Sequence, residues 1–386
     1  VGLFCEGRSN FADIASHKAD VVFQESLELE GIPSAETLRQ RIEDAAGTVT
    51  TEILDDNVNL LRMVDDFGRE KTPFGRYTPV AMDVTPLDNS GSHKEEIGRT
   101  YKGCDGYAPM MGYIGTEGYL LNCELRPGIQ HSQKGMTRFL KASIDMVESL
   151  GVDDALYVLD SAHDASENID ILQDRNCNFL IKRNLRQESL ECWLDFARAA
   201  GKLYAPRPGK EVFTGVACHM KPAKSKSDKP VFVVFEVIAR TSDYRGQEFL
   251  MSEIEVNTWW TNLTDDAETI IQLYHNHGTS EQFHSEFKTD MNVERLASGK
   301  FETNALLLRL AMLAFNVLRI IGQTALTFGK AVPVKLNIQR RRLRSVMQDL
   351  IYVACKRVAH ANRIILKFGR SCPWFEVFRL LHLKFC

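Results

Sequence analysis

The sequence has no long uncharged hydrophobic run. Its longest apolar stretch, residues 305–321, is interrupted by Arg309, Asn316 and Arg319, whereas a helix that crosses a bilayer needs ~20 apolar residues. The residues after Val1 also lack the basic-then-apolar pattern of a secretory signal. We therefore expect a cytoplasmic protein without a membrane span, whose start could have been clipped.

Cysteine patterns suited to metal or disulfide scaffolds are absent as well. The nine cysteines are odd in number and include no Cys-x-x-Cys pair, which argues against structural zinc and against a disulfide framework. No repeat at a fixed period and no low-complexity segment is visible. With 44% hydrophobic and 25% charged residues in 386, the composition is that of a globular protein with roughly two or three domains, or one domain with a large insertion.

The small net charge hides an uneven distribution. The formal charge is -4, yet residues 335–386 contain 12 Lys and Arg against 2 Asp and Glu, so this segment carries +10 and the rest -14. The run Arg340, Arg341, Arg342 and Arg344 lies here, and on a helix its first, second and fourth members would share one side. A solvated helix face and a phosphate contact are equally good interpretations.

Residues 1–75 have a helical pattern. Ser34 is a suitable N-cap for a helix over residues 35–46, in which Leu38 and Ile42 have i,i+4 spacing. Together with the preceding helix and its turn, this region could form a helix-turn-helix that binds DNA ends. The acidic residues around it would weaken phosphate contacts, so a plain helical bundle is favoured.

The rest of the chain predicts an α/β fold, a mixed sheet flanked by helices. Residues 76–184 show three β-type runs followed by a helix, a strand, a helix and a strand, and the order βββ-α-β-α-β is typical of such a sheet. Residues 185–255 are rich in turns and β-forming residues, which indicates a β-rich insertion. The sheet-and-helix pattern resumes over residues 256–330 with a long helix after Asp266. Residues 331–386 are predicted to be basic and helical, with one helix from Leu336 to about Phe368.

Two aspartates occur at the ends of apolar strands. Asp83 and Asp160 follow buried-type runs, where a carboxylate is costly unless it is paired or binds a cation. One such residue is more often a strand-end cap or an ion-pair partner, but two at one edge of a sheet make a ligand site equally plausible. Asp88 has the opposite strand parity to Asp83, and Asp164 is a better helix N-cap, so both are less suitable.

A polar stripe occurs on the helix predicted after Asp266. Tyr274, His277, Glu281 and Lys288 would lie within about 60° of one another on a helix. Spacing alone favours a solvated helix face over a functional site, and Gly278 weakens the helix prediction.

The intervals of this stripe resemble the Tyr-Arg-Glu-Lys signature of a large group of bacterial insertion-sequence DDE transposases. Asp83 in AMDVTPLDNS and Asp160 in YVLDSAHDASENI are similar to the first and second catalytic aspartates of that group. The segments GRTYKGCDGYAPMMGYIGTEGYLLNCELRPGIQHSQKG and YHNHGTSEQFHSEFKTDMNVERLASGKF resemble the same subgroup, and the resemblance covers roughly residues 30–370. His277 departs from the group's Arg, and a neutral imidazole holds phosphate less firmly.

The resemblance implies an RNase H-like core that brings together Asp83, Asp160 and Glu281. These carboxylates would hold two Mg²⁺ ions, which Mn²⁺ could replace, because Mg²⁺ takes oxygen ligands and leaves positions for substrate phosphate. Two ions about 3.5–4 Å apart can activate the attacking oxygen and stabilise the leaving one. Asp83 would bridge both ions, and Asp160 and Glu281 would each bind mainly one.

Double-stranded DNA is the implied partner, both as terminal inverted repeats and as target. The implied phosphate contacts are Tyr274, His277 and Lys288, and the charge distribution adds the candidates Arg340, Arg341 and Arg344. The expected protein hydrolyses the phosphodiester at the transposon end and uses the freed 3′-OH to attack target DNA. It is expected to act as a homodimer on DNA ends in the bacterial cytoplasm, at the nucleoid. The alternatives are an RNase H-like metal-dependent nuclease without strand transfer and an inactive DNA-binding descendant.

Trp259 and Trp260 are adjacent in a β-type run. Adjacent strand residues point to opposite faces, so we expect at most one of them in the core. Packing between insertion and core is favoured over stacking on an unpaired base of the transposon end.

Overall fold

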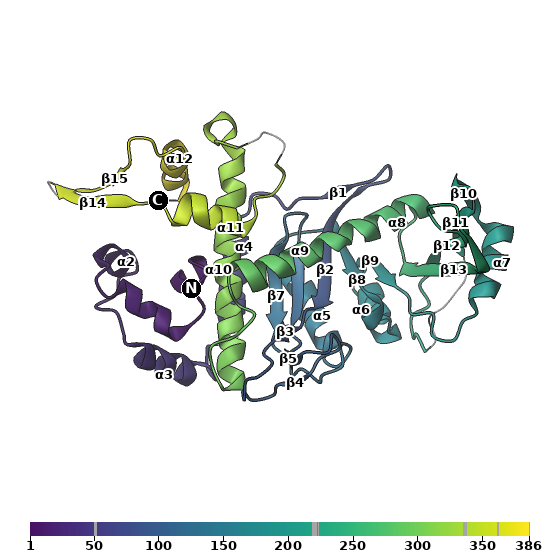
Figure 1. Ribbon diagram of the computed structural model, residues 1–386, viewed down its shortest axis with the longest axis horizontal. Coiled ribbons are helices and arrows are strands. Elements are labelled where there is room, and N and C mark those ends of the chain that lie inside the picture. Colours follow the sequence, from purple (N-terminus) through teal and green to yellow (C-terminus); the bar gives the residue numbers. More distant parts are fainter. Residues whose placement is uncertain (50–51, 218–221, 223, 335–337, 361–362, 386) are drawn as a thin grey trace.

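The computed structural model describes residues 1–49, 52–217, 222, 224–334, 338–360 and 363–385. The predicted fold class is confirmed, because a mixed sheet of ten strands carries helices on both faces (Figure 1). The strands of this sheet are β1 (Glu70–Lys71), β2 (Arg76–Val84), β6 (Met110–Ile114), β7 (Tyr119–Glu124), β8 (Ala155–Leu159), β9 (Asn178–Lys182), β10 (Lys202–Arg207), β11 (Lys210–Ala217), β12 (Phe232–Ser242) and β13 (Glu248–Thr261).

The strand order is β10-β11-β12-β13-β9-β8-β2-β6-β7, and β1 pairs with β2. Strands β2, β8 and β9 run parallel to one another, whereas β6 and β7 are antiparallel neighbours. In chain order, β2, β6, β7, β8 and β9 with their intervening helices follow the predicted order βββ-α-β-α-β. The buried apolar runs of β6 and β8 explain their central positions, since both faces of these strands are covered.

The segment predicted as an insertion extends the same sheet. It begins with α7 (Leu190–Ala200), whose N-cap Ser189 accepts a hydrogen bond from the backbone N–H of Cys192. Strands β10 to β13 then form an antiparallel meander at one end of the molecule (Figure 1). Strand β13 continues beyond residue 255 and pairs with β9 through Trp259, Trp260 and Thr261, so insertion and core share one strand.

Helices cover both faces of the sheet. One face packs against α5 (Met136–Ser149), α6 (Ser166–Asp174) and α7. The other packs against α8 (Ala267–Asn276), α9 (Ser280–Ser285) and α10 (Phe301–Thr327), and α8 and α9 lie in line across it (Figure 1). The remaining short elements beside the sheet are η2 (Ser161–His163), η3 (His277–Thr279), the π-helical turn η4 (Glu286–Asp290), η5 (Gly329–Ala331) and a small sheet of β3 (Leu87–Asp88), β4 (Gly98–Arg99) and β5 (Asp105–Tyr107).

Helix α10 is long and apolar enough to cross a membrane by length and composition, but it is built as a core helix. Its Asn316 amide donates to the side chain of Asn57 and to the carbonyl of Leu120. Its Arg319 is fully buried and forms an ion pair with Glu286 at 2.9 Å. Because these polar groups find their partners inside the protein, the packing of α10 explains its hydrophobicity.

The N-terminal region is helical, as predicted, up to β1. Its helices are α1 (Gly2–Cys5), η1 (Phe11–His17), α2 (Val21–Ser26), α3 (Ala35–Ala45) and α4 (Glu52–Leu61). The predicted cap is confirmed, since the Ser34 hydroxyl accepts from the backbone N–H of Thr37.

The prediction of one helix from Leu336 to about Phe368 is wrong. The helix comprises only α11 (Leu343–Val346) and the π-helical turn η6 (Met347–Ile351), and a two-stranded hairpin follows, β14 (Cys355–His360) with β15 (Arg363–Phe368). The β-branched residues Val358, Ile364 and Ile365 favour strands here. Helix α12 (Phe375–Phe385) ends the described chain.

Candidate active site

Asp83 and Asp160 lie side by side at the ends of neighbouring parallel strands. Met82 of β2 pairs with Leu159 of β8, so the next residue of each chain segment presents a carboxylate at the same edge. Loss of solvent raises the pKa of Asp160 to about 6, and the charge of Asp83 adds to this shift. The two carboxylates therefore repel each other, and a cation between them would relieve that repulsion.

A buried histidine lies behind each aspartate. His284 Nε2 is 3.6 Å from Asp83 Oδ2, and His163 Nε2 is 3.6 Å from Asp160 Oδ1. Burial lowers the pKa of His163 to about 4, so this ring is neutral at pH 7. The Tyr113 hydroxyl lies 3.2 Å from His284 Nδ1. Sequence reasoning missed both histidines, although each follows a candidate carboxylate residue by three positions.

Tyr101 was also missed, and the charges of all three candidate carboxylates act on its hydroxyl. The hydroxyl donates to the carbonyl of Val84, next to Asp83, at 2.9 Å. Its pKa is raised first by loss of solvent and then by the negative charges of Asp83, Asp160 and Glu281. The three carboxylates predicted as catalytic thus share one electrostatic neighbourhood.

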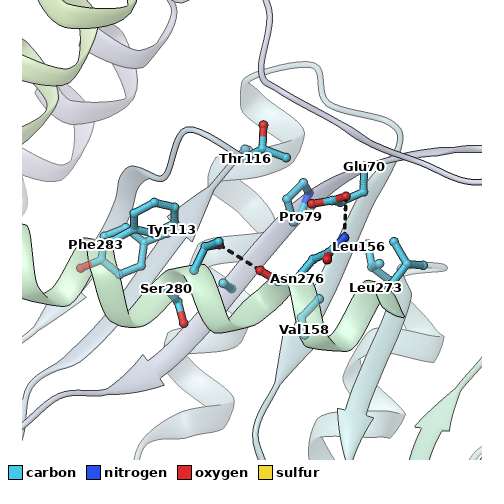
Figure 2. A pocket seen from close by; sticks show the side chains of 13 residues that line it. Glu70, Pro79, Tyr113, Thr116, Leu156, Val158, Leu273, Asn276, Ser280 and Phe283 are labelled. Carbon is cyan, nitrogen blue, oxygen red and sulfur yellow. Dashed lines mark hydrogen bonds between the residues drawn. The ribbon is translucent and has the colours of Figure 1, made fainter. Parts of the chain in front are cut away.

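The expected single helix with a continuous polar stripe is wrong. Helix α8 ends at Asn276, η3 follows, and α9 begins at Ser280 before the chain widens into the π-helical turn η4. The Asn276 amide donates to the Glu70 carboxylate at 2.9 Å and the Thr279 hydroxyl donates to the Asn276 carbonyl at 3.0 Å (Figure 2). These bonds fix the break and so set the direction of Glu281 relative to Tyr274.

A small apolar cavity lies beneath this break, between the helices and the sheet. Its walls include Tyr113, Val158, Leu273 and Phe283 (Figure 2). Its volume of about 30 Å³ has room for about one water molecule, so it is no substrate site. Gly118 packs against the Phe283 ring so closely that a Cβ there would lie 2.3 Å from it, which keeps α9 close to the sheet.

Glu281 and Glu286 follow each other on α9 and η4 but differ in environment. Glu281 is exposed. Glu286 is buried, forms ion pairs with Arg319 and Arg340, and accepts the backbone N–H of Leu343. Since these contacts occupy Glu286, Glu281 remains the suitable third carboxylate.

The other residues of the stripe are distributed around the aspartates. Tyr274 packs against Trp259, with ring centroids 5.5 Å apart, and its pKa is raised by burial and by the charges of Asp160 and Asp83. Loss of solvent lowers the pKa of Lys288. The backbone of His277 lies in η3, and its side chain is outside the part of the chain that the structure describes.

The carboxylates fit divalent metal in donor chemistry but are not gathered into a complete site. The repulsion between Asp83 and Asp160 supports a hard cation between two oxygen donors. Within the described ranges, no three His, Cys, Asp or Glu residues are close enough together to hold an ion. Glu281 would have to approach the aspartate pair to complete the set.

The arginine cluster does not form the expected helix side, because α11 begins only at Leu343. Arg340 forms an ion pair with Glu286, and Arg342 forms one with Asp290. The buried Arg341 forms an ion pair with Asp349 and stacks on the Trp374 ring. Arg344 is exposed, and within the described ranges its side chain has no ion pair. Most of the cluster's charge is thus used inside the protein, and DNA binding by Arg340, Arg341 and Arg344 stays a prediction.

A larger cleft, of about 680 Å³, opens beside the carboxyl ends of β8 and β9. Arg183, Arg186 and Asp164 line it, and Trp260 forms part of its wall. Asp164 is not the predicted N-cap, since Ala165 holds that position on α6; its carboxylate accepts the Trp260 indole N–H at 2.9 Å and the backbone N–H of Asn184.

Both tryptophans are buried, which corrects the expectation that one would be exposed. Trp259 is 1% and Trp260 is 5% exposed. Trp259 packs on the α8 face and Trp260 on the opposite face, because helices cover the shared strand from both sides.

Comparison with known proteins identifies a family across nearly the whole chain. Residues 2–385 match the family described as transposase DDE domain group 1. A solved piggyBac transposase synaptic complex with hairpin DNA is similar with a TM-score of 0.42 and 11% identity, over 70% of this chain and 51% of that chain. The chain therefore spans about half the length of that transposase. No curated protein matches the chain.

Proposed function

Because the chain belongs to the family of transposase DDE domains, group 1, we propose that it is an insertion-sequence transposase of the Tyr-Arg-Glu-Lys group. It would bind the terminal inverted repeats of its element, hydrolyse the phosphodiester at each end, and use the freed 3′-OH to attack a phosphodiester of target DNA, which joins the two strands and releases a 3′-OH of the target. We further propose that it acts as a homodimer on DNA ends in the bacterial cytoplasm, at the nucleoid.

One observation carries this proposal. Asp83 and Asp160 end adjacent parallel strands, and the charge of Asp83 helps to raise the pKa of Asp160 to about 6. Such a repulsive pair destabilises the protein without a ligand, so it supports a role in binding a cation. Glu281, which shares the neighbourhood of Tyr101 with both aspartates, would be the third ligand.

Mg²⁺, or Mn²⁺ in its place, would polarise the scissile phosphate and activate the attacking oxygen. The chain's own residues would position the DNA around that reaction. Lys288, half buried near Asp83, would hold a phosphate by its charge. Tyr274 would donate from its hydroxyl to a phosphate oxygen, and the neutral His163 would keep the back of Asp160 free of solvent.

The test is a strand-transfer assay with the element's own end DNA, a supercoiled target plasmid and Mg²⁺. The expected product is end DNA joined covalently to the plasmid. Asp83→Asn, Asp160→Asn and Glu281→Gln should each abolish cleavage while end binding stays nearly intact, because these groups serve chemistry rather than docking. Near wild-type cleavage by any one variant would remove that residue from the catalytic set.

The same assay separates the alternatives. Cleaved ends without joined product would favour a metal-dependent nuclease. Binding to end DNA without cleavage in either Mg²⁺ or Mn²⁺ would favour an inactive descendant. The three carboxylates in one neighbourhood favour the active enzyme over the latter.

A further inference from the structure

The hairpin of β14 and β15 carries positive charge without acidic residues beside it in the sequence. Residues 350–375 contain five Lys and Arg and no Asp or Glu. In Figure 1 the hairpin projects from the end of the molecule that carries both termini. Since Arg340, Arg341 and Arg342 are each neutralised by a carboxylate, this hairpin is a better candidate for binding an outside anion.

The register gives the hairpin two different faces. Direct cross-strand partners point to the same face, and the faces alternate along each strand. On one face, Arg357 lies opposite Leu366 and Cys355 opposite Phe368. This face is turned toward α2 and α12, because Arg357 forms an ion pair with Glu25 of α2 and the Phe368 ring packs 4.9 Å from that of Phe378 in α12, while Ile364 and Leu366 stay exposed.

The other face carries two lysines directly opposite each other. Lys356 pairs in register with Lys367, and both are exposed. Within the described ranges neither lysine forms an ion pair, and Val358 and Ile365 continue the same face. Like charges at directly opposed positions destabilise a sheet, and an isolated two-stranded hairpin is marginally stable in water. Among the described residues, the protein therefore provides no counter-charge for the two lysines of this face.

We infer that the face of Lys356 and Lys367 binds the phosphate backbone of double-stranded DNA. Each strand has 6 residues, which is about 20 Å of ribbon. A two-stranded ribbon fits the major groove, which is about 12 Å wide. Two lysines acting as point charges contact phosphates without reading bases, so the hairpin would hold DNA of any sequence. This inference rests on the proposed function, because it needs a protein that acts on DNA.

The test compares duplex-DNA affinity across salt concentrations for the full chain and matched double variants. Lys356→Ala/Lys367→Ala should lower the magnitude of the log K against log[salt] slope by up to about 1.8, or about 30-fold in affinity near 0.15 M salt. Lys356→Arg/Lys367→Arg keeps both charges and should keep the slope. The control Lys71→Ala/Lys141→Ala removes the same charge from two other exposed lysines and should leave the slope unchanged.

The outcomes separate this inference from the proposed function. Wild-type protein that binds no duplex DNA at any salt concentration would overturn both. DNA binding with equal slopes for wild type and the Lys356→Ala/Lys367→Ala variant would overturn only the role of the hairpin, as would an equal loss in the control. A loss of heparin binding with duplex-DNA binding intact would assign the face to another polyanion and overturn the inference. Unchanged thermal unfolding of the variants shows that the hairpin is folded in each comparison.

Discussion

Replacing Asp160 by Asn should stabilise the metal-free protein. The pKa of this carboxyl rises from 3.8 to about 6 in the folded chain. A shift of about two units corresponds to about 3 kcal/mol at most. Its side chain is 37% exposed, so solvent screening reduces the expected gain to about 1 kcal/mol. With an unfolding entropy of about 2.1 cal/mol/K per residue, the melting temperature should rise by about 1 °C.

The direction of this stability change follows from how the Asp160 carboxyl binds protons at different pH. An acid whose pKa is raised by folding binds more protons in the folded state, so stability is lost as pH rises from about 4 to about 6. Calorimetry in EDTA should show the variant above wild type at pH 7 and equal to it near pH 4. Mg²⁺ should reverse the order, because a ligand of the folded state stabilises only the protein that binds it.

Asp88→Asn is the matched control. Hydrogen bonds from Ser90 lower the pKa of Asp88, so neutralising it should give no gain at pH 7. If Asp160→Asn melts at or below the wild-type temperature at pH 7 without metal, the inference that the two aspartates repel each other is wrong.

Four further predictions concern the surroundings of the site and the arginine run. Glu286→Gln should lower the free energy of unfolding by about 3–5 kcal/mol, because it leaves the fully buried Arg319 without its counter-charge; a loss below 1 kcal/mol in denaturant unfolding would contradict this. Lys288→Ala should weaken end-DNA binding in gel shifts more than Mg²⁺ binding in calorimetry, and equal losses would refute the phosphate role of Lys288. His277→Arg should tighten end-DNA binding, because a guanidinium donates two hydrogen bonds to a phosphate, and an unchanged affinity would refute the phosphate role of position 277. Arg344→Ala should lower the magnitude of the salt slope by about 0.9, and an unchanged slope would make Arg344 part of a solvated face.

The sequence was sufficient for the sheet and for the two aspartates. Buried strands such as β8 appear as short apolar runs bounded by turns, and a charged residue at the end of such a run is visible without a structure. Asp83 and Asp160 could therefore be placed at one edge of the sheet. The histidines beside them could not be predicted, because nothing in the local sequence marks His163 and His284. Their place in the site follows only from the folded chain, where each lies 3.6 Å from an aspartate oxygen.

Two regions needed information from distant parts of the chain. The partners of Arg340 and Arg342 lie more than 50 residues earlier, at Glu286 and Asp290, and no periodicity reports such contacts. The C-terminal hairpin was mistaken for a helix because its apolar residues fit either spacing. Which face turns inward is decided by contacts with α2 and α12, and no local pattern in the sequence reports these contacts.

The strand shared by insertion and core, β13, limits how the chain can be recombined with relatives. A chimera cut at residue 255 would divide this strand just before Trp259 and Trp260, which pair with Lys182 and Ile181 of β9. A graft that is one residue too long or too short would exchange the faces of the two tryptophans. Each indole ring would then lie against the side chains that pack on the other one. A chimera that exchanges this insertion must therefore keep β13 intact through Thr261.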